Sequence, residues 1–184
     1  MKPYAIFLAL WLVSLPSALA QTGHVNWQGW DLTTTPALML RVWSLQNVSF
    51  NGTQILNKAS FPVMRVKYAG DVCGPYADIL WSSTFRPAPS APNSSCDGQT
   101  LCQRTYTQDG QDWLELGVNA QIGEYQIYQS YYFNPEGIID ARVFSRGLQC
   151  IIDHDHHAHW LLDFDIDGAE NDQVFKGENE FANH

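Results

Sequence analysis

Strand-like alternation of apolar and polar residues, rather than helical periodicity, is the feature that most constrains the fold of this chain. An apolar–polar period of two is typical of β-strands with one buried face. The predicted strands cover residues 38–42, 48–50, 62–68, 113–118, 125–133, 138–144 and 160–166. Short strands at this spacing predict an all-β fold, an antiparallel β-sandwich.

Turn signals separate these predicted strands. They are Asn51-Gly52, Asp109-Gly110, the run from Asn134 to Gly137, and Asp167-Gly168. Asn-Gly and Asp-Gly pairs favour the positive φ angles that tight hairpins need. Because residues 134–137 lie between two clear strand patterns, we expect a hairpin there.

The first twenty residues have the composition of a signal peptide. Lys2 supplies a positive start, residues 5–15 are apolar, and Ala18-Leu19-Ala20 matches a cleavage pattern. The apolar run is short and is broken by Pro16, which argues against a membrane span. We therefore expect a secreted protein without a membrane anchor, with one domain over residues 21–184.

Four cysteines fit an exported chain. An even number of cysteines suggests two disulfides, here with three alternative pairings among Cys73, Cys96, Cys102 and Cys150. Residues 86–102 are rich in proline and serine, so we expect a surface loop there. The favoured pairing closes that loop with Cys96–Cys102 and makes Cys73–Cys150 a long tie. Free, buried thiols are the alternative.

Sequons and net charge agree with an extracellular location. Asn47, Asn51 and Asn93 each begin an Asn-x-Ser/Thr triplet and are candidate glycosylation sites. The chain has 10 Lys and Arg against 19 Asp and Glu, a formal net charge of −9. This balance argues against nucleic acid and anionic membranes as partners, and it suits metal cations or cationic small molecules.

Four histidines within six positions are the sharpest chemical signal in the sequence. On a strand, residues two apart share a face, so His154 and His156 should point one way and His157 and His159 the other. Two imidazoles one pleat apart can bind Zn²⁺ or Cu²⁺ if a third ligand arrives from elsewhere. The alternative is a solvated polar strand that binds metal weakly.

Three alternating aspartates follow the histidines, at Asp163, Asp165 and Asp167. Carboxylates grouped on one face repel each other unless a hard cation or water screens them. Asp163, Asp165 and the carbonyl of Phe164 therefore form a candidate Ca²⁺ site. A solvated acidic strand end is the alternative, and the spacing is not that of an EF-hand.

Several short motifs, taken in order along the chain, resemble the catalytic domain of the copper amine oxidases. His154-Asp155-His156, Asp163-Phe164-Asp165 and Asp167-Gly168 with Asn171 resemble that family's His-x-His, Asp-x-Asp and Asp-Gly-x-x-Asn motifs. Upstream, the resemblance includes the family's first strand, its Asn-Gly, Ile-Leu and Ala-Ser segment, and the strand and hairpin that carry its cofactor tyrosine. These correspond here to residues 27–30, 50–60 and 122–137.

The resemblance implies an activity and a set of cofactors. Members of this family are dimers that bind one Cu²⁺ through three histidines and oxidise a nearby tyrosine to topaquinone. They convert primary amines and O₂ to aldehydes, ammonia and H₂O₂, with an aspartate removing the α-proton. By position, Tyr125 takes the quinone position, and His154 and His156 take two copper positions. The peripheral calcium positions fall on Asp163, Phe164 (through its carbonyl) and Asp165.

The chain departs from the family pattern around these residues. The cofactor motif Asn-Tyr-Asp/Glu-Tyr reads Glu124-Tyr125-Gln126-Ile127 here. The family's third copper histidine lies far downstream. The candidates to replace it here are His157, His159 or the terminal His184, and no motif supports any of them. Asp78 matches the family's base aspartate by rough position only.

Three functions therefore remain open. The first is a copper- and quinone-dependent oxidase of primary amines, and the second is a catalytically inactive secreted module that binds metal or another ligand. The third is a carbohydrate- or surface-binding sandwich, for which exposed tryptophans would serve as platforms. The candidates for such platforms are Trp27, Trp30, Trp43, Trp81, Trp113 and Trp160.

Overall fold

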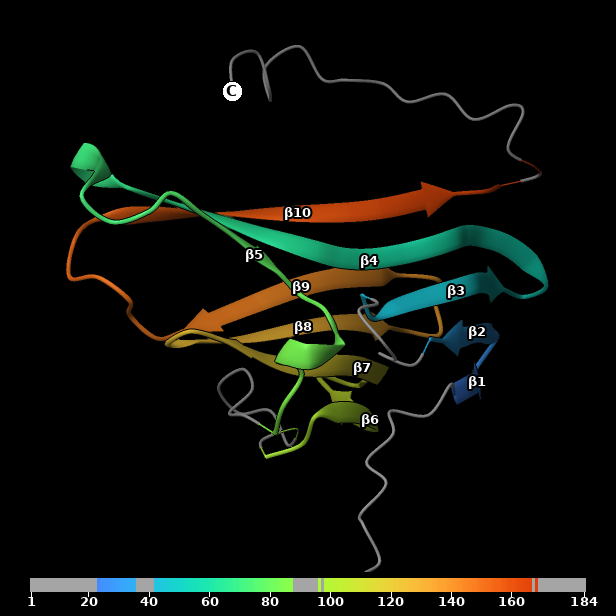
Figure 1. The fold of residues 1–184 in the computed structure, drawn as a ribbon. Coiled ribbons are helices and arrows are strands. Elements are labelled where there is room, and N and C mark those ends of the chain that lie inside the picture. Colours follow the sequence, from blue (N-terminus) through green and yellow to red (C-terminus); the bar gives the residue numbers. More distant parts are fainter. Residues whose placement is uncertain (1–22, 36–41, 88–95, 97, 167, 169–184) are drawn as a thin grey trace, which may run out of the picture.

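The computed structural model describes residues 23–35, 42–87, 96, 98–166 and 168. The predicted signal peptide lies outside the described residues, as do Asn93, His184 and most of the predicted strand 38–42. The described residues form two antiparallel β-sheets that face each other as the layers of a sandwich (Figure 1). The predicted all-β class is confirmed.

The larger sheet, sheet A, is built around one long strand. β4 (Thr53–Tyr68) pairs along one side with β10 (His154–Phe164) and along the other with β3 and β5. The remaining strands of sheet A are β1 (Gly23–Trp27), β2 (Trp30–Thr34), β3 (Ser44–Phe50) and β5 (Tyr76–Ile79), in the order β1-β2-β3-β4-β10 with β5 beside β4. Two short 3₁₀ turns, Ala69–Asp71 and Ser82–Thr84, flank β5.

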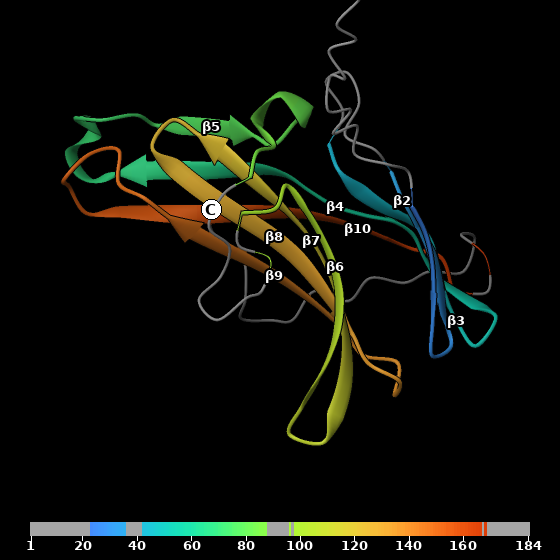
Figure 2. The ribbon, with the colours of Figure 1, turned by 90° about the horizontal axis from the view of Figure 1, so that it is seen from below.

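Sheet B is a meander of four strands in sequence order. It contains β6 (Leu101–Gln108), β7 (Gln111–Ile122), β8 (Tyr125–Phe133) and β9 (Ile139–Arg146). Figure 2 shows these strands as one curved layer, with β4, β5 and β10 behind it. Every residue of β8 from Ile127 to Phe133 is buried, so both faces of this inner strand of sheet B are covered.

The predicted turns join these strands. Asn51 and Gly52 have φ angles of 50° and 83°, and Asp109 and Gly110 have 54° and 78°, as two-residue hairpins with two positive φ angles require. The predicted hairpin between β8 and β9 is also present. There the side chain of Asn134 accepts hydrogen bonds from the backbone N–H groups of Glu136 and Ile138.

Two apolar clusters fill the space between the sheets. The first lies under β1, β2 and β3 and contains Trp30, Leu32, Trp43, Leu45 and Phe133. The second lies under β5 and β10 and contains Phe61, Met64, Val66, Tyr125 and Ile127. Tyr125, a candidate site residue, is thus part of the second cluster.

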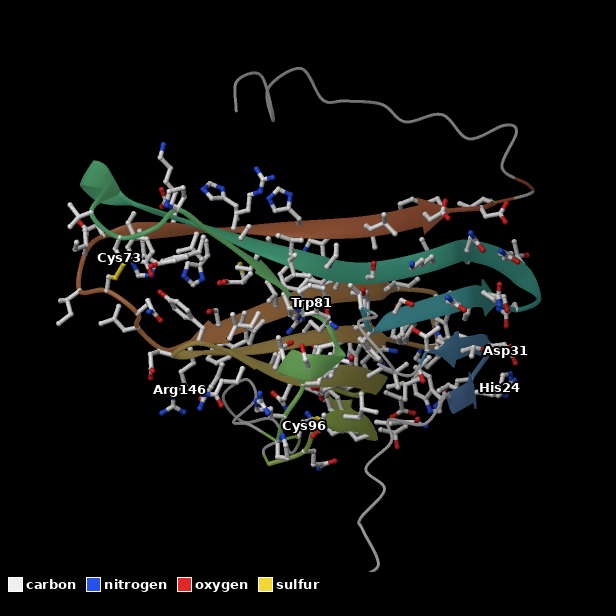
Figure 3. All side chains as sticks on the ribbon, viewed as in Figure 1. His24, Asp31, Cys73, Trp81, Cys96 and Arg146 are labelled. Carbon is white, nitrogen blue, oxygen red and sulfur yellow. A yellow bond between two sulfur atoms is a disulfide. The ribbon has the colours of Figure 1, made fainter. Side chains whose placement is uncertain are left out.

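Both favoured disulfides are confirmed. Cys73 pairs with Cys150, which ties the turn before β5 to the segment before β10. Cys96, labelled in Figure 3, pairs with Cys102 of β6 in sheet B, and both residues are buried. The predicted loop 86–102 ends inside β6, since Leu101 and Cys102 already belong to that strand.

β10 is an edge strand of sheet A, at the opposite edge from β1, among the strands that the structure describes. Its second half exposes Leu161, Leu162 and Phe164, and Ile166 just beyond it is also exposed. No helix in the described part of the chain is long and apolar enough to cross a membrane.

Candidate functional site

Tyr125 and the His154–His156 pair meet across the sandwich. Tyr125 begins β8 in sheet B and points inward with Ile127, because alternate residues of a strand share a face. His154 and His156 begin β10 in sheet A and are partly buried, whereas His157 and His159 are exposed. The alternation predicted for the four histidines is therefore confirmed, and the fold brings the inner two to Tyr125.

Backbone contacts fix the tautomer of His154. Its Nδ1 lies 2.8 Å from the carbonyl oxygen of Ile152, and a carbonyl can only accept, so Nδ1 carries the proton. In the neutral ring the other nitrogen, Nε2, carries the lone pair, and it lies 3.1 Å from the Tyr125 hydroxyl, which can donate to it. His154 thus presents an acceptor nitrogen to Tyr125, which is the form that binds a metal ion.

The second imidazole has a buried nitrogen without a partner. The His156 ring centroid lies 5.0 Å from that of His154 and 5.0 Å from that of Tyr125. Its Nε2 is buried and makes no hydrogen bond. Burial lowers the pKa of His156, and the neighbouring His154 and His157 add to this effect, so the neutral imidazole is favoured.

Tyr68 completes the cluster and was not singled out from the sequence. Its hydroxyl lies 2.8 Å from the Tyr125 hydroxyl, and its ring stacks on His154 with centroids 4.7 Å apart. Burial and the Tyr125 hydrogen bond raise the pKa of Tyr68 to about 12. The sequence feature that could have identified it is its place in the predicted strand 62–68. Tyr68 follows Met64 and Val66 at intervals of two, and all three are buried.

Asp78 lies in β5 and pairs with Met64 across the sheet, so it shares the inward face of that residue. Partial burial raises the pKa of the Asp78 carboxyl, and the carboxylate in turn helps raise the pKa of Tyr68. A desolvated carboxylate of this kind is suited to accept a proton. Its pairing with Met64 and its effect on the pKa of Tyr68 therefore place Asp78 near the tyrosine cluster.

The donor set for a metal consists of two imidazoles and one phenol. No group of three or more His, Cys, Asp or Glu side chains within the described ranges is placed to hold a metal ion. The orphaned Nε2 of His156 and the oriented Nε2 of His154 nevertheless fit two positions of a nitrogen-rich site. His154 and His156 thus present two imidazole nitrogens, and the Tyr125 hydroxyl lies 3.1 Å from the Nε2 of His154.

The aspartates of the candidate calcium site bind amide side chains. Asp163 accepts a hydrogen bond from Asn57 at 2.8 Å, and Asp165 accepts one from Gln54 at 3.0 Å. The register shifts between Asp163 and Phe164, and β10 ends at Phe164, so simple alternation stops there. Asp167 lies outside the described residues.

The remaining candidates are distributed over the surface and core. Asn47 and Asn51 are exposed, which leaves both available for modification. Trp30 and Trp43 are fully buried, and Trp27 and Trp160 pack against the core from partly buried positions. Trp81 and Trp113 are also only partly exposed. The tryptophans thus act mainly in packing, and Trp113 also lines a pocket described below.

Comparison with known proteins identifies solved structures with a similar fold. No protein-family model and no curated protein sequence matches the chain. Among solved structures, a lysyl oxidase of Pichia pastoris matches with a TM-score of 0.63 and 15% identity, over 78% of this chain and 27% of that one. A copper-containing benzylamine oxidase of Hansenula polymorpha matches with a TM-score of 0.58 and 16% identity, over 90% and 36%.

An amine oxidase of Aspergillus nidulans matches with a TM-score of 0.63 and 14% identity, over 91% of this chain and 32% of that one. The chain spans about a third of the length of these enzymes or less. At such identities the likeness concerns the fold: the described strands form a copper amine oxidase-like β-sandwich.

Proposed function

We propose that this chain is a secreted copper amine oxidase-like protein that acts on primary amines with O₂. One observation carries the proposal: the Tyr125 hydroxyl meets the acceptor nitrogen of His154 at 3.1 Å, with His156 against the same ring. By the same resemblance, the amine is converted to an aldehyde and the assembly is a homodimer.

His154 and His156 would hold copper through their Nε2 atoms, and Tyr125 would be the residue converted to topaquinone. Together these groups would supply the redox chemistry that amine oxidation requires. The Ile152 carbonyl orients His154, and Tyr68 holds the Tyr125 oxygen by a hydrogen bond. Asp78, desolvated and on the inward face, would accept a proton from the substrate.

The test is to load the full chain with Cu²⁺ under air and to measure both metal content and redox-cycling quinone staining. We expect stoichiometric copper and a quinone signal that is lost in Tyr125→Phe. His154→Ala/His156→Ala should lose the copper as well, whereas the matched pair His157→Ala/His159→Ala, on the exposed face, should retain both signals. A quinone signal that survives in Tyr125→Phe contradicts the assignment.

The second candidate is a metal-binding module without catalytic activity. It is favoured by the altered neighbours of Tyr125 and by a donor set of only two imidazoles and one phenol. The same experiment separates the two functions, because copper without quinone staining supports the module. Calcium at Asp163, Phe164 and Asp165 remains a separate proposal, tested by a rise in melting temperature with Ca²⁺ that is absent in Asp163→Asn/Asp165→Asn.

A further inference from the structure

A pocket of about 190 Å³ lies on the outer face of sheet B, away from the tyrosine and histidine cluster. It forms at the β6–β7 hairpin, where Tyr106 pairs with Trp113 and Gln108 pairs with Gln111 across the two strands. Tyr132 of β8 and Arg142 of β9 complete its lining. Aromatic rings and amides thus share one small concave site.

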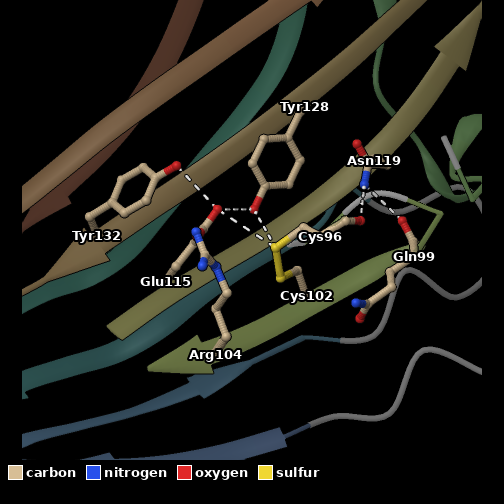
Figure 4. Close-up of a disulfide and its surroundings, with 8 residues drawn as sticks. All are labelled: Cys96, Gln99, Cys102, Arg104, Glu115, Asn119, Tyr128 and Tyr132. Carbon is tan, nitrogen blue, oxygen red and sulfur yellow. Dashed lines mark hydrogen bonds and ion pairs between the residues drawn. A yellow bond between two sulfur atoms is a disulfide. The ribbon is translucent and has the colours of Figure 1, made fainter. Parts of the chain in front are cut away.

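A buried carboxylate binds the side chain of Tyr132, which lines this pocket. Glu115 is fully buried and accepts hydrogen bonds from the hydroxyls of Tyr132 at 3.1 Å and Tyr128 at 2.5 Å (Figure 4). Arg104 binds its second oxygen, and the Arg104 guanidinium lies 4.4 Å from the centre of the Tyr106 ring. The rings of Tyr106 and Tyr132 are therefore held in place before any ligand arrives.

Gly117 is needed for this network. A Cβ at residue 117 would overlap the hydroxyl and ring of Tyr128, which lies over that position. The absence of a side chain lets the Tyr128 ring cross β7 and reach Glu115 beside the Cys96–Cys102 disulfide. The pocket is thus supported by a cluster specific to this face of the sheet.

The charges around the pocket disfavour ionic ligands of either sign. Arg104 and Arg142 already lie over the faces of Tyr106 and Tyr132, where an added cation would otherwise make its cation–π contact. An added anion would meet the carboxylate of Asp109, and Arg142 is already bound to Asp140 through two hydrogen bonds. A neutral ligand needs neither an open aromatic face for a charge nor an unpaired arginine.

We propose that this pocket binds one sugar ring of a neutral carbohydrate. The apolar C–H face of a sugar would pack on Trp113 and Tyr106, since aromatic side chains combine apolar area with a polar rim. The amides of Gln108 and Gln111 offer both donors and acceptors to neighbouring hydroxyls. The volume of about 190 Å³ suits one ring of a longer chain rather than a large ligand.

The test is affinity electrophoresis of the full chain without added metal, in gels containing laminarin, xylan, galactomannan or hydroxyethylcellulose. We expect retardation in at least one gel, and at least a tenfold weaker interaction for Trp113→Ala and for Gln108→Ala/Gln111→Ala. Tyr76→Ala, an exposed tyrosine in sheet A, is the matched control and should behave like the wild type. Melting temperatures of all variants show that they fold.

Three outcomes would overturn the proposal: no retardation in any neutral polysaccharide, retardation that persists in both pocket variants, or retardation only in gels of charged alginate. The glutamine variant matters here, because its two positions lie on the hairpin ends and not in the core. Copper and quinone play no part in this experiment, so its result is independent of the proposed oxidase function.

Discussion

The Tyr68 hydroxyl on β4 lies 2.8 Å from the Tyr125 hydroxyl on β8, and both groups are buried. The two strands belong to different sheets, so this hydrogen bond joins the layers of the sandwich. Since the Tyr125 hydroxyl also contacts His154, a substitution at Tyr68 can alter the candidate metal site through this one oxygen atom.

Replacing Tyr68 by phenylalanine should therefore lower the free energy of unfolding by about 1 kcal/mol, the usual loss for one hydrogen bond. Urea denaturation measures this change. Tyr131→Phe is the control, because the Tyr131 hydroxyl is buried without a hydrogen-bond partner and its removal should be neutral or stabilising. Equal losses in the two variants would contradict the assigned partner.

Asp78→Asn should stabilise the protein at pH 7 more than at pH 3. The folded-state pKa of Asp78 is raised by burial, so below the ordinary aspartate pKa of 3.8 the carboxyl is neutral in both states and costs nothing. As the pH rises through the raised folded pKa, the unfolded state loses its proton first and stability falls. The asparagine variant lacks this fall, which denaturation curves across pH would reveal.

Asp31→Asn provides a control of opposite sign. Hydrogen bonds from Asn26 and then His24 lower the pKa of Asp31, so its contribution to stability is present above 3.8 and is lost as the pH falls. The asparagine variant should therefore lose stability at neutral pH and match the wild type in acid. If the stability of Asp78→Asn and of Asp31→Asn changed with pH in the same way, the opposite pKa directions assigned to the two carboxyls would be wrong.

Much of the fold was predictable because it depends on local patterns. β8 was predicted at its observed bounds, and the hairpins at Asn51-Gly52 and Asp109-Gly110 follow from residues that tolerate positive φ. β1, β2, β5 and β6 were not predicted as strands. β5 has only four residues, too few to show a clear alternation. It is a strand because it pairs with residues 63–66 of β4.

Glu115→Gln should cost about 2 kcal/mol, because the carboxylate accepts charge-assisted hydrogen bonds that an amide cannot fully replace. Arg104, Tyr128 and Tyr132 all bind this one buried group. Glu124→Gln is the matched control: Glu124 is exposed, so the change should stay within about 0.5 kcal/mol. Thermal and urea denaturation of both variants would check this.

The two disulfides should differ in their contribution to stability. In the chain-entropy account, the Cys73–Cys150 bridge, with a sequence separation of 77, contributes about 4 kcal/mol, and Cys96–Cys102, with a separation of 6, about 2 kcal/mol. Paired Cys→Ser variants measured by denaturation would show the order. The reverse order would mean that the packing around buried Cys96 outweighs the effect of loop length.

The candidate site was only partly predictable for a physical reason. His154, His156 and Tyr125 could be named from spacing and resemblance, and parity correctly predicted which histidines share a face. The contacts of Tyr68 and of Glu115 depend on strands distant in sequence that meet only after folding. Alternation tells which face a side chain occupies, but not what stands opposite it.

The outer edge of β10 has a consequence for the behaviour of the protein in solution. No described strand covers that edge, and Leu161, Leu162 and Phe164 leave it apolar along its second half. Open backbone groups next to apolar side chains form a template on which another extended chain can add. Colloidal stability therefore depends on the exposed carboxylates of Asp155 and Asp163 on the same strand, whose mutual repulsion between molecules opposes stacking.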